Sequence, residues 1–190
     1  MYRILFVCHG NICRSTMAQS VMAHLVAEAG REDEFRIDSA ATSREEIGNP
    51  PHRGTVSRLQ RAGIAVVPHR ARQVRGDEYG DWDYIVGMDS ENMRGLSRIF
   101  SSNAACRADG GAKLAKLLSF AGSSRDVADP WYTGDFDATY ADVVNGCTAL
   151  LEMLAERLRG AGLRDAGGGD RGRDLVRKLW RRWCANHVLF

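Results

Sequence analysis

Short apolar runs alternate with segments of helical periodicity over most of this chain, and no other feature restricts the fold as strongly. Candidate buried strands lie at residues 3–7, 34–40 and 84–88, with a weaker one within 112–118. Candidate helices lie at residues 15–30, 53–63 and 90–100, and a longer apolar helical face ends at Leu158. Such alternation is typical of a parallel sheet with helices on both faces. We therefore expect an α/β fold with three layers.

The apolar pattern predicts one domain, over residues 1–159. Within it, the stretch 119–137 is rich in Gly, Ser and Asp and is expected to be a long surface loop. Residues 160–174 are Gly-rich, which is typical of a flexible linker. Residues 175–190 then form a separate basic tail.

The charged residues are unevenly divided between the body and the tail. Residues 160–190 carry seven Lys or Arg against three Asp, whereas residues 1–159 carry 19 basic against 21 acidic residues. So short a basic patch does not favour a nucleic-acid partner. The five cysteines lack the spacing of a disulfide framework, which favours a reducing compartment. Since no secretory signal or long apolar run is visible, we expect a cytoplasmic protein.

The chemistry is concentrated in the segment "VCHGNICRST", directly behind the first strand. In open α/β sheets, ligands bind beyond the carboxyl ends of the strands, and Cys8 lies at such an end. A turn of this length can curl so that its N–H groups and the following helix N-terminus form a nest for an oxyanion. Gly10 permits a positive φ there, and Asn11 is the next most tolerant residue. Arg14 adds a fork of donors suited to a phosphate.

The same cradle favours the thiolate of Cys8, because it stabilises any anion placed in it. The Ser15 hydroxyl is expected to donate a hydrogen bond to that thiolate. A thiolate beneath a bound phosphate is a nucleophile aimed at phosphorus. A single Cys at the end of a strand is usually only packed in the core, but Cys, Gly, Asn, Arg and Ser at this spacing favour catalysis. The chain lacks the motifs of nucleotide-binding loops.

Displacement of an alkoxide or phenoxide from phosphorus needs a proton donor. Asp129 in "VADPWYTGDFD" is the best candidate, because Pro130 stiffens the segment and the aromatic pair Trp131 and Tyr132 can wall a ring-bearing substrate. Apolar neighbours and an approaching phosphate dianion would favour the protonated carboxyl. We expect Asp129 to act as general acid.

These segments together resemble the low-molecular-weight protein tyrosine phosphatase family. The likeness rests on "VCHGNICRS" and "DPWYTG", and "IDSAATS", "HRARQV" and "YIVGMDSENMRGL" match the family pattern in order between them. It covers roughly residues 3–158. The resemblance implies a four-stranded parallel sheet of flavodoxin-like order. It also implies hydrolysis of protein phosphotyrosine without metal or cofactor, and release of inorganic phosphate. Cys8 would take the phosphoryl group, and Asp129 would protonate the leaving group and then activate water.

The resemblance also implies roles for the neighbouring residues. The phosphate would be bound by the loop residues His9, Gly10, Asn11, Ile12, Cys13, Arg14 and Ser15. Asn11, Ser15, Ser39 and His69 would hold the loop in shape. Cys13 would form a reversible disulfide with Cys8 and so shield it from irreversible oxidation.

Three positions depart from the family pattern. Thr16 stands where the family usually has Pro, and little effect is expected. His9 at the mouth of the loop can add charge that depends on pH. Glu45 and Glu46 lie where the family often supplies an aromatic residue against the substrate ring, so acidic peptides should be disfavoured.

Three other functions compete with this interpretation. Arsenate reductases of this fold need two further cysteines after the second helix, and residues 75–100 contain none. Arginine phosphatases of the same family have a small hydroxyl residue at the position of Ile12, whose apolar branch favours an aryl substrate. A phosphate-binding module without turnover would be expected to lack the nucleophile or the acid.

The tail lies outside the resemblance. Its apolar residues recur at helical spacing over 175–183, with Arg and Lys between them. Such a basic amphipathic pattern can bind an anionic membrane surface or an acidic partner. The alternatives are a helix that packs on the body, or a disordered end.

Overall fold

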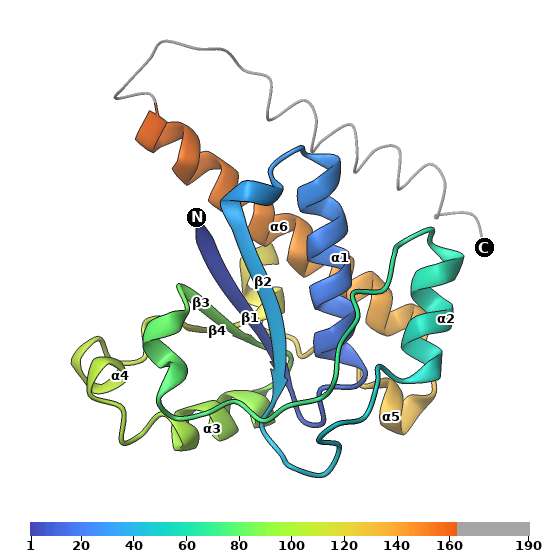
Figure 1. The fold of residues 1–190 in the computed structure, drawn as a ribbon, viewed down its shortest axis with the longest axis horizontal. Helices are drawn as coiled ribbons and strands as arrows, with labels where there is room; N and C mark the ends of the chain where they lie inside the picture. The colour runs from blue at the N-terminus through green and yellow to red at the C-terminus, as the bar shows by residue number, and fades with distance from the viewer. Residues whose placement is uncertain (163–190) are drawn as a thin grey trace.

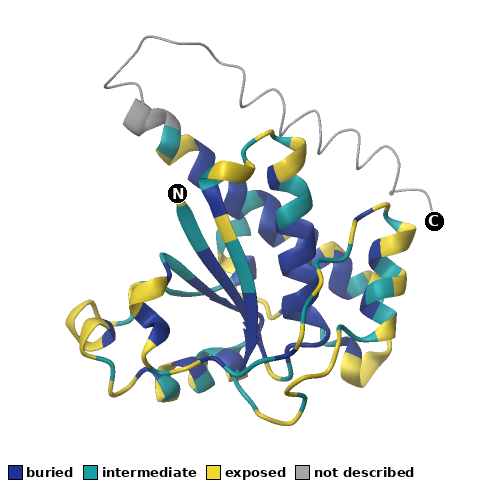
Figure 2. Ribbon diagram, in the orientation of Figure 1, coloured by how far each residue is buried: buried dark blue, intermediate teal, exposed yellow. Residues whose placement is uncertain are grey.

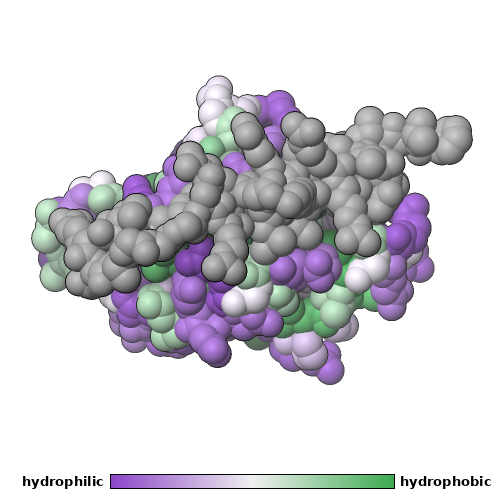
Figure 3. Space-filling model, turned by 90° about the horizontal axis from the view of Figure 1, so that it is seen from above, coloured by the Kyte–Doolittle hydropathy of each residue, from purple (hydrophilic) through white to green (hydrophobic). Residues whose placement is uncertain are grey.

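A computed structural model describes residues 1–162 of the protein. The basic tail, and all but the start of the expected linker, lie outside the described residues. The helix that closes the domain runs to Gly162, three residues into the stretch expected to be a linker. Among the described residues, no helix is long and apolar enough to cross a membrane. On the face shown in Figure 3, hydrophobic side chains of the described part lie in small patches among hydrophilic ones.

Four parallel strands form the central sheet, in the order β2-β1-β3-β4 (Figure 1). They are β1 (Tyr2–Cys8), β2 (Phe35–Ala41), β3 (Tyr84–Gly87) and β4 (Leu114–Lys116). The predicted four-stranded parallel sheet is thus confirmed. The fourth strand, expected within residues 112–118, is three residues long. The chain leaves β1 for one side of the sheet and later returns to the other side, so the strand order reverses at β1. The carboxyl end of such a strand is where this class of fold binds ligands, and Cys8 ends β1.

Alternate side chains of β1 enter two separate cores, because successive residues of a strand point to opposite faces. Ile4 and Phe6 pack with helices α1 (Arg14–Glu28), α2 (Arg53–Arg61) and α6 (Phe136–Gly162). Leu5 and Val7 pack on the other face, with α3 (Ser90–Ile99) and α4 (Ala104–Ala108). Figure 2 shows the buried residues running along the sheet and the adjoining sides of α1 and α6. The three-layer prediction is therefore confirmed.

The stretch 119–137 is not the uniform loop that its composition predicts. The 3₁₀ helix Leu117–Ala121 extends into it, α5 (Pro130–Thr133) lies within it, and α6 begins at Phe136. Asp129 caps α5 at its N-terminus, Pro130 occupies the first turn, and Gly134 at φ 70° ends it. A helix defined by caps alone is too short to show apolar periodicity. Helix α4 and the 3₁₀ helices Glu32–Glu34 and Glu78–Asp81 are likewise too short.

Candidate active site

The turn between β1 and α1 curls beneath the Cys8 sulfur. Asn11 has φ 58°, and its backbone N–H lies 3.2 Å from Cys8 Sγ. The sequence allowed a positive φ at either Gly10 or Asn11, and the structure has it at Asn11. Gly10 leaves room for the Glu46 side chain, since a Cβ at this position would lie 3.0 Å from Glu46 Cγ. An amide aimed at sulfur stabilises negative charge on that sulfur.

Carbonyl groups of the same turn are bound on its outer side. The His52 N–H donates to the Ile12 carbonyl at 2.7 Å, and the Thr16 hydroxyl lies 3.0 Å from the carbonyls of Ile12 and Cys13. The Thr55 hydroxyl also reaches the Cys13 carbonyl, at 3.3 Å. Because these carbonyls are satisfied on the outer side, the inner side is left to N–H donors, as an anion site requires.

The hydroxyl of Ser15 is directed at the candidate nucleophile. Its Oγ lies 3.1 Å from Cys8 Sγ and accepts a hydrogen bond of 3.0 Å from Asn11 Nδ2. Since that bond occupies an oxygen lone pair, the Ser15 hydrogen remains available to the sulfur. The sequence analysis predicted that Ser15 donates to Cys8, and the structure places the Ser15 hydroxyl within hydrogen-bond distance of Cys8 Sγ.

The strained backbone of Asn11 is held through its side chain, which is fully buried. Nδ2 also donates to Ser39 Oγ at 2.9 Å, and Oδ1 lies 2.7 Å from His69 Nε2 and 3.1 Å from the Arg72 backbone N. An amide oxygen only accepts, so His69 carries a proton on Nε2. Burial lowers the pKa of His69 below its ordinary value of 6.5. The structure therefore brings Ser39 and His69 to the loop from β2 and from the segment after α2.

Two members of this network were not identified from the sequence. Gln19, which is buried, accepts a hydrogen bond of 2.7 Å from Ser39 Oγ. It lies four residues after Ser15 and so on the same side of α1, which is the signal that could have found it. The Arg72 backbone N–H carries no side-chain signal in the sequence. Its side chain is fixed by Asp38 at 2.9 Å and Glu78 at 3.0 Å.

Arg14 is buried at the rim of the nest and contacts two carboxylates. Nη1 lies 2.5 Å from Asp89 Oδ2, and Nη2 lies 2.6 Å from Asp129 Oδ2. Burial opposes the charge of the guanidinium, but Cys8, Asp129 and Asp89 outweigh it and raise the pKa of Arg14. Arg14 therefore stays a cation in the anion site.

Asp89 is a site residue that the sequence analysis missed. It caps α3, where its Oδ1 accepts a hydrogen bond of 2.6 Å from the Asn92 backbone N–H. It follows β3 by two residues, and β3 pairs with β1. Because carboxyl ends of parallel strands meet at one edge, an Asp at this place is a signal that could have been read.

Asp129 lies at the N-terminal cap of the short helix α5. Its Oδ1 accepts from the Trp131 backbone N–H at 3.0 Å, which leaves Oδ2 for Arg14. Trp131 and Tyr132 are 62% and 85% exposed, so their rings are free to contact a substrate. The Trp131 ring meets His52 edge-on, with centroids 6.5 Å apart. His52 in turn stacks on Phe136 at 5.2 Å.

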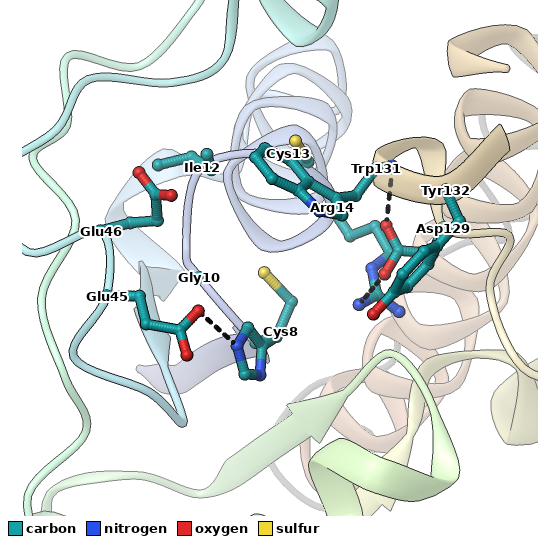
Figure 4. A pocket seen from close by; sticks show the side chains of 11 residues that line it. Cys8, Gly10, Ile12, Cys13, Arg14, Glu45, Glu46, Asp129, Trp131 and Tyr132 are labelled. Atoms are coloured by element: carbon teal, nitrogen blue, oxygen red, sulfur yellow. Dashed lines mark hydrogen bonds and ion pairs between the residues drawn. The ribbon is translucent and has the colours of Figure 1, made fainter. Parts of the chain in front are cut away.

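These side chains surround one cleft of about 160 Å³ (Figure 4). Its lining comprises Cys8, His9, Gly10, Ile12, Cys13, Arg14, Glu45, Glu46, Asp129, Trp131 and Tyr132. Figure 4 shows Cys8 at the floor between the Arg14–Asp129 pair and the two glutamates. Burial, with added repulsion from Cys8 and Asp129, raises the pKa of Cys13 to about 12.

The rim opposite Asp129 is acidic. His9 Nε2 lies 3.0 Å from Glu45 Oε2, and both side chains are exposed. Glu46 Oε2 accepts a hydrogen bond of 2.6 Å from Asn49 Nδ2. The structure thus places both glutamates in the lining of the cleft, at the place where the family pattern often has an aromatic residue.

The arrangement combines an anion nest, a fixed cation, a thiol at its centre and a carboxyl at its edge. Within residues 1–162, no group of three or more His, Cys, Asp or Glu side chains could hold a metal ion. The four cysteines of this part of the chain are free thiols. These groups have the chemistry that a nucleophile, an anion clamp and a proton donor need for displacement at phosphorus.

Comparisons with known proteins agree with one another. A family model described as low molecular weight phosphotyrosine protein phosphatase matches residues 3–160. Low molecular weight protein-tyrosine-phosphatase YfkJ of Bacillus subtilis is 40% identical over 156 residues, covering 81% of this chain and 96% of the relative. The human low molecular weight phosphotyrosine protein phosphatase is 40% identical over 152 residues, covering 78% and 93%.

Solved structures give the same result. The crystal structure of YfkJ from Bacillus subtilis superimposes with a TM-score of 0.76 at 38% identity, covering 83% of this chain and 96% of that chain. A Drosophila arginine phosphatase superimposes with a TM-score of 0.71 at 28% identity, covering 80% and 96%. The fold is therefore shared by proteins named for two different phosphorylated residues.

Proposed function

The chain belongs to the low molecular weight phosphotyrosine protein phosphatase family and is a phosphatase, and from this premise we propose that it hydrolyses phosphotyrosine in proteins through a phosphocysteine intermediate. The observation that carries the proposal is the convergence of Cys8, Arg14 and Asp129 on one cleft. They come from the end of β1, the start of α1 and the cap of α5. Each supplies one part of a displacement at phosphorus.

In the first step the Cys8 thiolate attacks phosphorus while Arg14 and the loop amides hold the phosphoryl oxygens. The sulfur–phosphorus bond forms as the bond to the tyrosyl oxygen breaks. Asp129 gives its proton to that oxygen, so neutral tyrosine leaves. Proton donation of this kind is worth about 10²–10⁴-fold in rate.

In the second step a water molecule attacks the phosphocysteine. Asp129, now a carboxylate, takes a proton from the water, and the sulfur–phosphorus bond breaks. The electron pair returns to Cys8, where the Ser15 hydroxyl at 3.1 Å and the Asn11 amide at 3.2 Å stabilise the departing sulfur. Inorganic phosphate is released, and no metal or cofactor takes part.

The walls of the cleft bear on substrate choice. The exposed rings of Trp131 and Tyr132 offer flat apolar surface to a tyrosine ring. Glu45 and Glu46 occupy the other wall, and their charge disfavours acidic residues beside the phosphotyrosine. The proposed substrates are therefore phosphotyrosine proteins without acidic flanking residues.

We propose that the protein works in the cytoplasm and that reversible oxidation of Cys8 regulates its activity there. Peroxide oxidises the Cys8 thiolate to a sulfenic acid and releases hydroxide. The Cys13 thiol then attacks that sulfur, which forms a Cys8–Cys13 disulfide and releases water. Thiol reductants restore both cysteines, and Cys13 thereby protects Cys8 from irreversible oxidation.

Phosphoarginine is the second candidate substrate, because a structural neighbour is an arginine phosphatase. Ile12 lines the cleft beside the phosphate loop, and its apolar branch offers no hydrogen bond to a guanidinium. The site therefore favours the aryl ester. Synthetic peptides carrying either phosphoryl residue distinguish the two candidates.

The test compares the wild type with Cys8→Ser on phosphotyrosine and phosphoarginine peptides of the same sequence. We expect turnover of the phosphotyrosine peptide, a burst of product at high enzyme concentration, and no turnover by the variant. Faster release of phosphate from the phosphoarginine peptide would reverse the substrate assignment. Unaltered activity of Cys8→Ser would exclude the phosphocysteine.

A separate proposal concerns residues 175–183, which lie outside the described residues. This proposal rests on the sequence alone. We propose that this basic, tryptophan-containing segment binds anionic membrane surfaces. Full-length protein should sediment with vesicles containing anionic lipid, and a truncation after Gly162 should not. Equal sedimentation of both would refute membrane binding through the tail.

A further inference from the structure

The segment that leads into Asp129 is anchored to α6 by two side chains. Asp142 Oδ2 accepts a hydrogen bond of 3.0 Å from the Ala128 backbone N–H. The Thr139 hydroxyl donates to the Ala128 carbonyl at 2.9 Å. Both groups of Ala128, the residue directly before Asp129, are therefore held by α6.

The two anchoring residues lie three positions apart, so they share one side of the helix. Both are buried, at 8% exposure for Asp142 and none for Thr139. The Asp142 carboxylate also receives the fork of Arg125, with Nη1 at 2.8 Å and Nη2 at 2.5 Å. A buried carboxylate with three donors is fixed in place, and it can fix what it holds.

The contact with Ala128 bears directly on the proton donor. The carbonyl that Thr139 binds belongs to the peptide unit that joins Ala128 to Asp129, and peptide units are planar. Only three rotatable bonds, N–Cα, Cα–Cβ and Cβ–Cγ of Asp129, then set the place of its carboxyl relative to this anchored unit. That carboxyl must reach a leaving oxygen to within hydrogen-bond distance to work as an acid.

From this arrangement we propose that Asp142, together with Thr139, is a positioning residue that sets the place of the Asp129 carboxyl for proton transfer. The inference rests on the proposed function, in which Asp129 protonates the leaving group. It gives Asp142 a task that goes beyond joining a loop to a helix. A residue that only stabilised the fold would affect every substrate alike, whereas a residue that places the acid affects substrates according to their need for a proton.

The experiment compares kcat/KM for two aryl phosphates. This constant reports only the steps up to and including departure of the phenol, which is where the proton is needed. Phenyl phosphate has a poor leaving group that needs the proton, and p-nitrophenyl phosphate has a good one that needs it little. For Asp142→Ala we expect a loss of about 10-fold on phenyl phosphate, a part of the range for a general acid. On p-nitrophenyl phosphate we expect a change of less than about 2-fold. Equal losses on both substrates would overturn the proposal.

Companion variants separate the contacts of Asp142. Arg125→Ala removes two of the three donors to the Asp142 carboxylate but leaves the oxygen that binds the Ala128 N–H, so its selective loss on phenyl phosphate should be smaller than that of Asp142→Ala. Asp142→Asn keeps an acceptor oxygen and should recover most of the lost activity on phenyl phosphate. Asp137→Ala is the matched control, because Asp137 lies on the same helix and pairs with Arg58 and Arg61 without touching Ala128. A leaving-group effect in Asp137→Ala would contradict the proposal.

Two further measurements keep the test decisive. Thr139→Val removes the other anchor without a new charge and should reproduce the selective loss even if Asp142→Ala fails to fold. Asp142→Ala in the Asp129→Ala background should cause no additional loss on phenyl phosphate, since there is no acid left to place. An additive loss there would overturn the proposal. If Asp129→Ala itself showed no leaving-group dependence, the proposed function would fail instead.

Discussion

Arg14 and Asp129 form an ion pair of 2.6 Å across the mouth of the cleft, so the cation that should bind phosphate is also bound by the candidate acid. A phosphate dianion that enters the nest competes with Asp129 for the same guanidinium nitrogen. Once displaced, the carboxyl lies beside a dianion, and this repulsion favours the protonated form that an acid needs. In the proposed mechanism, the ion pair would thus link arrival of the substrate to protonation of Asp129.

The first prediction follows from that competition. Asp129→Asn removes the negative charge that competes for Arg14, so inorganic phosphate and vanadate should bind several-fold more tightly than to the wild type. Turnover of phenyl phosphate by the same variant should fall by about 10²–10⁴-fold, because the acid is lost. Inhibition constants and steady-state rates measure the two effects. Weaker oxyanion binding in Asp129→Asn would show that the pair does not compete with phosphate.

The second prediction concerns the other partner of Arg14. Asp89→Asn keeps an oxygen that caps α3, as Asn is a good N-cap, but removes the charge that holds Arg14 Nη1 at 2.5 Å. Hydrogen bonds between charged groups contribute about 1.5–3 kcal/mol, so kcat/KM should fall by roughly 10- to 100-fold. The inhibition constant for phosphate should rise in parallel. Unchanged phosphate affinity would mean that Arg14 does not depend on Asp89 for its position.

Much of this site could be predicted from the sequence because its key groups lie in one continuous turn. Cys8, Asn11, Arg14 and Ser15 fall within eight residues, and a strand-to-helix turn brings them together by local geometry alone. Asp89 and Gln19 were missed because their partners, Arg14 and Ser39, lie on other elements. The ion pairs of Arg14 depend on the sheet order, which sequence periodicity does not reveal. Helix α5 was not predicted because its ends are set by capping residues and it is too short to show an apolar repeat.

The third prediction is a pH dependence of stability that arises from His69. Burial lowers the pKa of His69 in the folded protein below 6.5, the value expected when unfolded. Between these two values the unfolded chain binds more protons than the folded one. The contribution of His69 to the free energy of unfolding is therefore present above pH 6.5 and is lost as the pH falls below it.

Melting temperatures of the wild type and His69→Gln at pH 7.5 and 5.5 measure this effect. Gln offers a donor to Asn11 Oδ1 but does not titrate. The difference between the two proteins should shrink at the lower pH. A difference that grows on acidification would contradict a lowered pKa for His69.

The fourth prediction concerns the packing that supports the aromatic wall. A Cβ on Gly54 would lie 2.3 Å from the nearest ring atom of Phe136, whose ring stacks on His52. Gly54→Ala therefore forces the ring to move and should cost about 1–3 kcal/mol of unfolding free energy. Gly80→Ala is the control, since nothing lies within 4 Å of a Cβ at that position. Urea denaturation measures both, and equal stabilities of the two variants would contradict the overpacking.

The last prediction concerns the Cys8–Cys13 disulfide, whose rate depends on Cys13 as a thiolate. Since the pKa of Cys13 is raised to about 12, almost all of this thiol is protonated at neutral pH, and its attack on oxidised Cys8 is slow there. Each pH unit toward that value increases the thiolate about tenfold, and thiolate is the form that attacks sulfur. After a pulse of peroxide, the share of activity that dithiothreitol restores should therefore rise from pH 6.5 to pH 8.5. Cys13→Ala should show a small recoverable share at every pH, because Cys8 proceeds to higher oxidation states. A recovery that is independent of pH in the wild type, or equal in Cys13→Ala, would remove Cys13 from the protection of Cys8.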